Sequence, residues 1–503
     1  MFARNLWLSV AIHICFGYSP YIQLSLLNTV AGKVQRFLNE SVAESYGHNV
    51  TETELKSLWA AVTTAYSLGV VFGTALFGWT ADRIGRKAAV MIVANVFCIA
   101  GSLTEFGAVL VGRPELLLLG RLTVGVASGF AIFAYVLVAE CAASAKQAGF
   151  LSSFLTASTQ IPVVLGTVVG LLLGSDRLWF YSFLASIPPA VVHILCYFWL
   201  HDSPKHLYIT CGSEERARNA YNFYQGESAN WEKHKAELDA EKALSEAAHS
   251  KTASIAEIFK TKHLRWPFVL CVVAGMGPPT SGIVLGSFYS TDIMVEQGIS
   301  EEWAALATVL MMQLPSAVLS VGTSLSRVVD HLGRKPTYLF GMAVGIVSTL
   351  LLTLAGQPLQ GAARNVCLLL GLFGAQQAFF LGPMMVSGVL SVEICPQASR
   401  AATAAATQAS IFGFGIVVAL GFPPLAAVVG SWAVLPQTAV AVAVVLFLLY
   451  ALPESRGKTV DEIVDHWKEE KKDSANGKSR EGHKGRMLGG KVYAEGRDAQ
   501  TTM

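Results

Sequence analysis

Long apolar runs and short polar breaks alternate along almost the whole chain. An α-helix needs about 20 apolar residues to cross the hydrocarbon layer of a membrane. Runs of about that length cover residues 5–28, 57–80, 87–105, 115–139, 149–173, 178–200, 266–292, 302–326, 336–356, 364–392, 401–428 and 432–452. Six runs precede a long polar insert and six follow it. The pattern therefore predicts an all-α membrane protein with twelve transmembrane helices in two six-helix halves.

A charged hairpin occurs twice, each time after an apolar run. The first copy reads Asp82-Arg83-Ile84-Gly85-Arg86-Lys87 and the second reads Asp330-His331-Leu332-Gly333-Arg334-Lys335. The offset of 330 − 82 = 248 residues is close to half of the 503-residue chain. The repeat predicts two pseudo-symmetric copies of one membrane-spanning unit, which is how rocking transporters are built.

Four segments follow from this division. Residues 1–200 and 266–456 are the predicted six-helix halves. The linker 201–265 carries Lys, Glu and Ala at helical spacing, which predicts short amphipathic helices on the cytoplasmic membrane surface, with a solvated linker as the alternative. The tail 457–503 is polar and has few large apolar residues, so we expect it to be disordered.

Composition agrees with a membrane protein and excludes several other classes. Hydrophobic residues make up 53%, charged residues only 14%, and the net charge of +2 gives no support for a nucleic-acid partner. The eight cysteines show no C-x-x-C pair and no metal-ligand spacing. We find no nucleophile with a base, no phosphate loop and no paired acids at a catalytic spacing, so we expect neither an enzyme nor a bound metal or cofactor.

The distribution of Lys and Arg predicts the orientation in the membrane. Basic residues gather in the loops that hold the two hairpins, the linker and the tail, which the positive-inside rule places in the cytoplasm together with both termini. The sequons at Asn39 and Asn49 both fall in the first loop on the opposite side, and we predict that they are glycosylated.

The plasma membrane is the expected location, with an endolysosomal membrane as the alternative. The last residues, Thr501-Thr502-Met503, weakly resemble a ligand of PDZ domains.

Several motifs in the same order give the chain a family resemblance. They are Phe16-Gly17-Tyr18, Gly78 to Lys87, Gly120-Arg121 with Gly125 and Gly129, Asp202-Ser203-Pro204-Lys205, Ser281-Gly282-Ile283 leading to Tyr289-Ser290-Thr291, Glu393 with Arg400, and Pro453 to Thr459. With these motifs the chain resembles the sugar porters of the major facilitator superfamily, particularly the animal facilitative glucose transporters. The resemblance implies the major facilitator fold and transport of a small organic solute by alternating access.

The hairpins and their neighbours are the predicted gating residues. Asp82 and Arg86, like Asp330 and Arg334, can form charge-assisted bonds that differ between two states of a transporter. The resemblance adds Arg83 in the first hairpin, Arg121 in the fourth span, and Glu140, Glu393, Arg400, Glu454 and Arg456 at the cytoplasmic side. Static helix caps are the alternative. We call the gating residues of each half its latch. Gln147 stands where the family has an Arg, so we expect the latch of the first half to be weaker than that of the second.

The predicted substrate site departs from the family. Of the residues that hold sugar hydroxyls in the family, only Gln160 matches, because Pro278, Pro279, Val284, Val318, Gly388 and Gly415 replace the others and Phe380 replaces a span-10 Glu. The remaining polar candidates in the spans are Thr280, Ser281, Gln376, Gln377 and Gln408. Each can instead make an ordinary hydrogen bond between helices.

The positions of acids, histidines, prolines and glycines in the spans bear on proton coupling and on helix breaks. Ser19 occupies the place of the acid that proton-linked members carry, and we expect no other acid well inside the first half, which favours uniport. Proton coupling through His13 and His193, and a non-transporting sensor or scaffold, remain the alternatives. Pro and Gly at 275–279 and 382–388 predict broken helices in spans 7 and 10.

Overall fold

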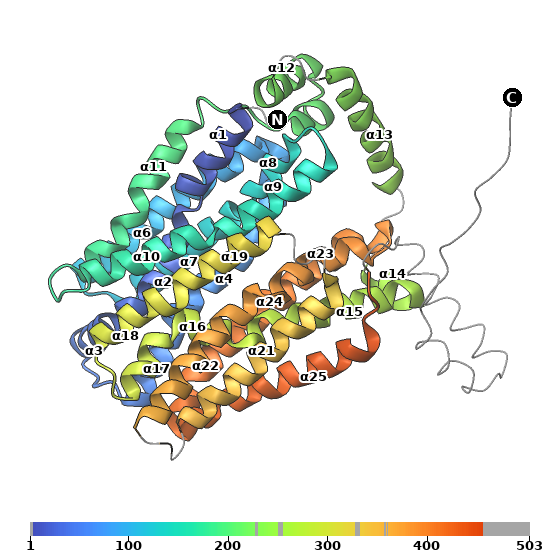
Figure 1. Ribbon diagram of the computed structural model, residues 1–503. Coiled ribbons are helices and arrows are strands. Elements are labelled where there is room, and N and C mark those ends of the chain that lie inside the picture. The colour runs from blue at the N-terminus through green and yellow to red at the C-terminus, as the bar shows by residue number, and fades with distance from the viewer. Residues whose placement is uncertain are drawn as a thin grey trace, which may run out of the picture.

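The computed structural model describes residues 4–226, 230–249, 255–326, 332–356, 359 and 361–455. Within this part of the chain the regular structure is helical (Figure 1). The first half contains α1 (Arg4–Ile12), α2 (Ile22–Thr29), α3 (Ala31–Tyr46), α4 (Glu52–Ile84), α5 (Arg86–Ala88), α6 (Ala94–Val111), α7 (Pro114–Ala131), α8 (Ala134–Glu140), α9 (Ala145–Ser158), α10 (Gln160–Leu173) and α11 (Ile187–Cys196).

The linker and the second half follow in the same way. The linker has α12 (Glu214–Gln225), α13 (Trp231–His249) and α14 (Ile255–Lys260). The second half contains α15 (Lys262–Pro278), α16 (Val284–Phe288), α17 (Ser290–Glu296), α18 (Glu301–Ala307), α19 (Leu314–Ser326), α21 (Arg334–Ala355), α22 (Ala362–Phe380), α23 (Pro383–Glu393), α24 (Gln397–Val429) and α25 (Leu435–Ala451). The predicted tail lies outside the described residues.

The apolar pattern located the membrane-spanning helices correctly. Within the described residues, 11 helical segments are long and apolar enough to cross a membrane. The last of them, Ala402–Ala451, has 50 residues and covers two of the predicted runs. A short 3-10 turn at Gly430–Val434 separates α24 from α25 inside it, so the twelve predicted spans are accounted for.

Helix breaks occur in spans 7 and 10, as predicted. In span 7 a π-helical turn, Pro279–Ile283, separates α15 from α16, and Gly282 has φ 103°, a conformation that favours glycine. In span 10 α22 ends at Phe380 and α23 begins at Pro383. The sequence analysis missed a further break in span 1, where a π-helical turn, His13–Gly17, and a 3-10 turn, Ser19–Tyr21, separate α1 from α2.

Glycines allow the closest helix packing in the first half. Helices α4 and α7 touch backbone to backbone, because a Cβ at Gly125 would overlap the carbonyl oxygen of Tyr66 and a Cβ at Gly73 would overlap that of Val126. Close approach through small residues is the usual way in which helices associate inside a bilayer. The Gly120 to Gly129 motif is therefore explained by packing.

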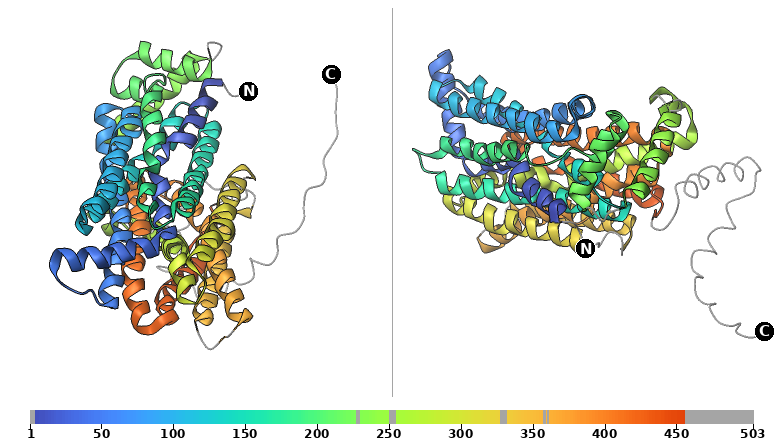
Figure 2. Two further views of the ribbon diagram at one scale, coloured as in Figure 1. Left: turned by 90° about the vertical axis from the view of Figure 1, so that its left-hand side faces the viewer. Right: turned by 90° about the horizontal axis from the view of Figure 1, so that it is seen from above.

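The two halves lie side by side with their helices roughly along one direction (Figures 1 and 2). One end of this bundle holds the start of α1 together with α12, α13 and α14, and is called the linker end. The opposite end holds α3 and α17, and is called the α3 end. This arrangement separates the two groups of polar contacts that form the candidate site.

Candidate functional site

At the linker end, the second hairpin closes a compact ion-pair cluster. Arg334 forms a fork with Glu393, with Nη2 at 2.7 Å and Nε at 2.9 Å from Oε1. The hydroxyl of Ser455 donates to the other oxygen of Glu393 at 2.6 Å. Glu454 accepts hydrogen bonds from the backbone N–H groups of Arg334 and Lys335 at 3.0 and 3.2 Å, so it caps the start of α21. Gly333, with φ 99°, turns the chain into this helix.

The first half repeats this arrangement with a looser ion pair. Ser203 donates to Glu140, as Ser455 does to Glu393. Asp202 accepts from the backbone N–H of Lys87 at 3.1 Å, as Glu454 does from Arg334 in the second half. Arg86, however, has its Nε 3.6 Å from Glu140. Its Nη1 lies 2.6 Å from Nδ1 of His206 instead.

His206 explains the looser pair. Burial lowers the pKa of His206, and the positive charge of Arg86 adds to this effect. A neutral imidazole can accept from a guanidinium through its unprotonated nitrogen. The guanidinium of Arg86 is thus shared between Glu140, His206 and Asp82, which lies 3.3 Å away. The ion pair of Arg86 is thus looser than that of Arg334. The weaker first-half latch, expected from Gln147, stays a prediction; the side chain of Gln147 accepts from the backbone N–H of Ala143 at 2.8 Å.

The remaining predicted gating residues at this end have varied surroundings. Arg83 lies over the ring of Trp79, with its guanidinium carbon 4.1 Å from the ring centre. Arg400 donates to the carbonyl oxygen of Cys395 at 3.5 Å. Asp330 and Arg456 lie outside the described residues. The ion pairs described above join residues of the same half.

At the α3 end, polar contacts cross between the halves. Asn28 of α2 donates to Ser290 at 2.7 Å and accepts from the backbone N–H of Thr291 at 3.2 Å. The hydroxyl of Thr63 in α4 lies 2.8 Å from that of Tyr289. All of these residues are buried.

Two more cross-half contacts converge on Asp292 of α17. The indole N–H of Trp59 donates to its Oδ2 at 2.7 Å, and the amide of Gln35 donates to its Oδ1 at 3.0 Å. Lys56 forms an ion pair with Glu296 at 3.0 Å beside them. Helices α2, α3 and α4 of the first half are therefore bonded to Tyr289 and to α17 of the second.

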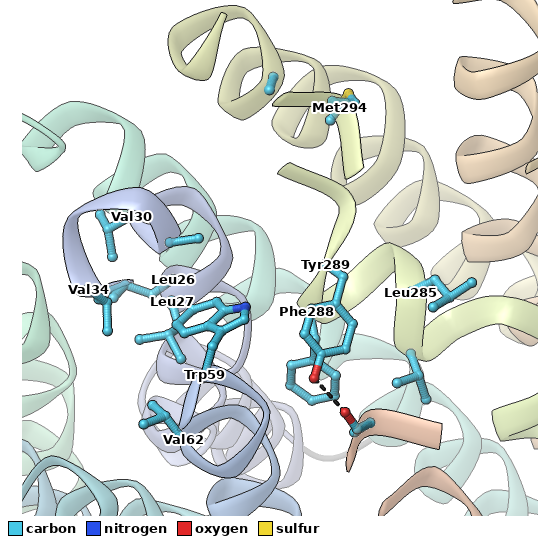
Figure 3. Packing of buried hydrophobic residues seen from close by; sticks show 14 of the residues in the cluster. Leu26, Leu27, Val30, Val34, Trp59, Val62, Leu285, Phe288, Tyr289 and Met294 are labelled. Atoms are coloured by element: carbon cyan, nitrogen blue, oxygen red, sulfur yellow. Dashed lines mark hydrogen bonds between the residues drawn. The ribbon is translucent and has the colours of Figure 1, made fainter. Parts of the chain in front are cut away.

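A shared apolar cluster surrounds these bonds. Figure 3 shows Leu26, Leu27, Val30, Val34, Trp59 and Val62 of the first half close to Leu285, Phe288, Tyr289 and Met294 of the second. Burial of apolar surface contributes about 25 cal/mol per Å². The α3 end is therefore closed by one continuous core, and opening it would expose both the apolar cluster and the polar bonds.

A buried ion pair in the first half corrects the sequence analysis. Glu105 and Arg121 are both fully buried, with Glu105 Oε1 3.8 Å from Arg121 Nη1. Helix α6 continues to Val111, so Glu105 lies well inside it, whereas the predicted run ended at Glu105. The expectation of no acid inside the first half was wrong, because one charged residue followed by further apolar residues was taken as the end of a span.

Other buried polar groups surround this pair. Arg121 donates to the carbonyl oxygen of Gln23 at 2.9 Å, and its guanidinium lies over the ring of Tyr66. Within the described residues neither carboxylate oxygen of Glu105 accepts a hydrogen bond. His13 and His193 lie further toward the linker end, edge to face with ring centres 5.1 Å apart, and His193 is 2.8 Å from the amide of Asn95.

The six predicted substrate ligands fall into two groups. Thr280 and Ser281 are bonded to carbonyl oxygens of their own helix, and Gln376 and Gln377 to Gln313 and Ser316, respectively. Gln160 of α10 and Gln408 of α24 differ, because their side-chain carbonyl oxygens have no hydrogen-bond partner within the described residues. Among the six, these two amides each keep a buried carbonyl oxygen without a partner in the described part of the chain.

Two glycines leave space where the family carries large polar residues. No atom lies within 4 Å of a Cβ built on Gly388, and the nearest atom to one on Gly415 is the Cβ of Pro279 at 3.8 Å. In the described part of the chain, no group of three His, Cys, Asp or Glu side chains could hold a metal ion.

Sequence reasoning missed Asp292, Trp59, Gln35 and His206 as well as Glu105. Asp292 was placed at the end of an apolar run, and the others have no motif of their own. A signal was available for Asp292, since it directly follows the Tyr289-Ser290-Thr291 motif. Its two partners come from residues more than 200 positions away, which no local pattern can indicate.

Comparison with known proteins gives consistent matches. The family model described as "Sugar (and other) transporter" matches residues 13–467. The mouse facilitated glucose transporter member 7 is 27% identical over 467 residues, covering 91% of this chain and 88% of the relative. The human facilitated glucose transporter member 11 is 26% identical and covers 89% of each chain.

Solved structures match over almost the whole chain. A structure of XylE, described as a major facilitator superfamily proton:xylose symporter, has a TM-score of 0.70 at 20% identity and covers 93% of this chain and 100% of that one. The inward open conformation of XylE from E. coli has a TM-score of 0.67 at 21% identity, covering 92% and 99%. These likenesses establish the major facilitator fold.

The unequal ion pairs at the linker end give a prediction for stability. Arg334→Lys should lower the free energy of unfolding by about 1–2 kcal/mol, because lysine cannot form the fork with Glu393. Arg86→Lys should cost less than about 1 kcal/mol, because Arg86 forms no fork with Glu140. The midpoint of thermal unfolding in detergent measures both, with Arg83→Lys as the control. Equal shifts for Arg334→Lys and Arg86→Lys would contradict the assignment.

Proposed function

Because this chain belongs to the sugar (and other) transporter family, we propose that it moves a small, sugar-like organic solute across a membrane by alternating access, as a uniport. The chain is a multi-pass membrane protein of the major facilitator fold. The relatives' names, which include facilitated glucose transporters, support a solute of the sugar class. The segments 1–200, 201–265 and 266–456 then serve as the two moving halves and the linker between them.

The observation that carries this proposal is the contrast between the two ends. At the α3 end hydrogen bonds and an apolar core cross from one half to the other. At the linker end the ion pairs of Arg86 and Arg334 lie within each half, so they keep each half rigid while the halves move apart. The bonds that cross on this side join two hydroxyl groups of α19 to the backbone of α9. Two states that differ in the contacts between rigid halves are what alternating access requires.

The proposed solute site uses Gln160 and Gln408. Their carbonyl oxygens can accept from hydroxyl groups of a solute, and Gly388 and Gly415 leave room that a larger or less polar solute can fill. Thr280, Ser281, Gln376 and Gln377 are secondary ligands in this proposal, because each must exchange an existing hydrogen bond for one to the solute. Sites that bond hydroxyl groups discriminate through such pairing.

The proposed orientation places the linker end in the cytoplasm and the α3 end outside, at the plasma membrane. Basic residues of both hairpins and the linker favour this side. The sequon residues Asn39 and Asn49 are exposed at the α3 end, where a glycan can be attached. In this orientation the structure has its outer side closed. An endolysosomal location would keep the same topology, and a PDZ-type contact of the last residues would be cytoplasmic.

An uptake screen in proteoliposomes tests the transport function. We expect saturable uptake of at least one member of a radiolabelled panel of hexoses, polyols, ascorbate-like acids and less polar metabolites. Gln160→Ala and Gln408→Ala should each lower it by about twofold to tenfold, because one hydrogen bond contributes about 0.5–1.5 kcal/mol. Gln297→Ala is the control, since within the described residues the bonds of Gln297 are made by its backbone, from its N–H to Val295 and from Arg364 to its carbonyl. Absence of uptake by the folded protein would contradict transport, and unchanged uptake in both variants would contradict the site.

Proton-coupled symport is the second candidate, and the pair of Glu105 and Arg121 favours it. An acid and a base buried inside the bilayer are functional candidates by default. The carboxylate has no hydrogen bond within the described residues and depends on Arg121 for compensation. Opening of this pair could expose Glu105 to a proton in one state and not in the other.

A pH gradient separates uniport from symport. Uniport predicts that an inward proton gradient leaves the final solute level in vesicles unchanged. Symport predicts accumulation that Glu105→Gln abolishes and Glu105→Asp retains. Because Glu105→Gln leaves Arg121 buried without a counter-charge, the double variant Glu105→Gln/Arg121→Gln controls for folding. Gradient-driven accumulation that survives Glu105→Gln would exclude this residue as the proton carrier.

A further inference from the structure

Asp292 is held between the two halves at the α3 end. It belongs to α17 of the second half, and both of its hydrogen-bond donors belong to the first half, Trp59 on α4 and Gln35 on α3. Each carboxylate oxygen has one of the two donors. Because these bonds cross the interface, they exist only while the α3 end is closed.

The charged groups around Asp292 are compensated by other partners. A cavity of about 180 Å³ beside it is lined by Lys56 of α4, Glu296 of α17 and Glu301 of α18, together with Tyr289 and Phe422. Lys56 pairs with Glu296 at 3.0 Å and with Glu52 at 3.3 Å.

The other nearby groups give Asp292 no counter-charge either. The basic residues of α3, Lys33 and Arg36, pair with Asp176, and the hydroxyl of Tyr289 bonds to Thr63 and Ala419. Within the described residues no cation forms an ion pair with Asp292. The charge of Lys56 lowers the pKa of Asp292 from a distance, but Lys56 is paired with Glu296 and Glu52, so the ionised form would be held at the interface with little compensation.

We propose that Asp292 is a proton-binding site that closes the outer side of the transporter when it is protonated. This inference rests on the proposed transport function and on the orientation that places the α3 end outside. It concerns an external proton that changes the balance between two states, and it requires no proton to cross the membrane.

The hydrogen bonds fit the neutral acid as well as the ion. In the neutral acid Oδ2 still accepts from the indole of Trp59. The proton on Oδ1 can be donated to Gln35 once the amide of Gln35 turns by 180°, which exchanges its oxygen and nitrogen. Protonation therefore keeps both cross-half bonds and removes the uncompensated charge.

The direction of the pH effect follows from the two environments. Burial raises the pKa of Asp292 to about 7 in the closed state, and the nearby Glu296 adds to this, while the bonds from Trp59 and Gln35 oppose it. Opening of the α3 end would admit water and return the pKa toward about 3.9. The closed state then binds the proton more tightly, so acid favours it. For one such group, the ratio of closed to open molecules should be about tenfold higher at pH 6 than at pH 8.

Spin-label distances across the α3 end test this site. Glu44→Cys on α3 and Glu302→Cys on α18 carry the labels, since both glutamates are exposed. The cysteines that are not buried, Cys15, Cys196, Cys211 and Cys367, are replaced by alanine. In the purified protein in lipid nanodiscs we expect a short and a long distance, with the short-to-long ratio about tenfold higher at pH 6 than at pH 8.

Variants assign the effect to one residue. Asp292→Asn should remove the pH dependence and keep the short distance dominant at both pH values, because an amide mimics the neutral acid. Asp292→Ser is a second neutral variant in case the first fails to fold. Glu296→Gln is the matched control, since Glu296 is a half-exposed acid on the same helix, and it should keep most of the pH dependence.

Two results would overturn the proposal. Two distances whose ratio does not change between pH 6 and pH 8, or a pH dependence that persists in Asp292→Asn, would exclude Asp292 as the proton site and leave the transport function intact. A single distance under all conditions would overturn the proposed function together with the site.

Discussion

The closure of the α3 end is the contact on which the state of this protein depends. Buried polar groups of the first half, such as Asn28 and Thr63, bond directly to Ser290 and Tyr289 of the second. A buried polar group that loses its partner costs about 1–3 kcal/mol, so these bonds must be exchanged for bonds to water before the halves can separate. The apolar cluster around them adds to the same barrier (Figure 3). This cost sets the balance between the closed and the open state of the α3 end.

The linker end is built in a different way, and the difference explains how the halves move as units. In each half a glycine with positive φ turns the hairpin into the next helix, an Arg pairs with a Glu, and a second acid caps the helix start. These contacts tie distant helices of one half together. The first half shares Arg86 with His206, so its cluster is looser than the one around Arg334. On this side too, hydroxyl groups of α19 donate across to the backbone of α9, from Ser320 to Ala157 and from Ser324 to Ser153. Rigid halves joined by contacts that can be exchanged are sufficient for a rocking motion.

The sequence predicts the fold well, because the signal for a membrane helix is a long uniform run. Helix breaks at Pro279–Ile283 and before Pro383 could also be predicted, since Pro and Gly act locally. Glu105 was missed because a single acid inside an apolar helix looks like the end of the helix. The role of Asp292 was missed because it depends on hydrogen bonds from Trp59 and Gln35, which are distant in sequence and come close only in the folded chain. The gating and substrate residues remain predictions that the geometry supports to different degrees.

A reversible cross-link at the α3 end tests the central claim most directly. Asn28 and Ser290 lie in opposite halves with their side chains 2.7 Å apart, so Asn28→Cys/Ser290→Cys can form a disulfide there. With alternating access, oxidation should stop solute uptake into proteoliposomes and reduction should restore it, while each single variant stays active under oxidation. Uptake that continues at its full rate in completely cross-linked protein would contradict the account, because transport would then not require the α3 end to open.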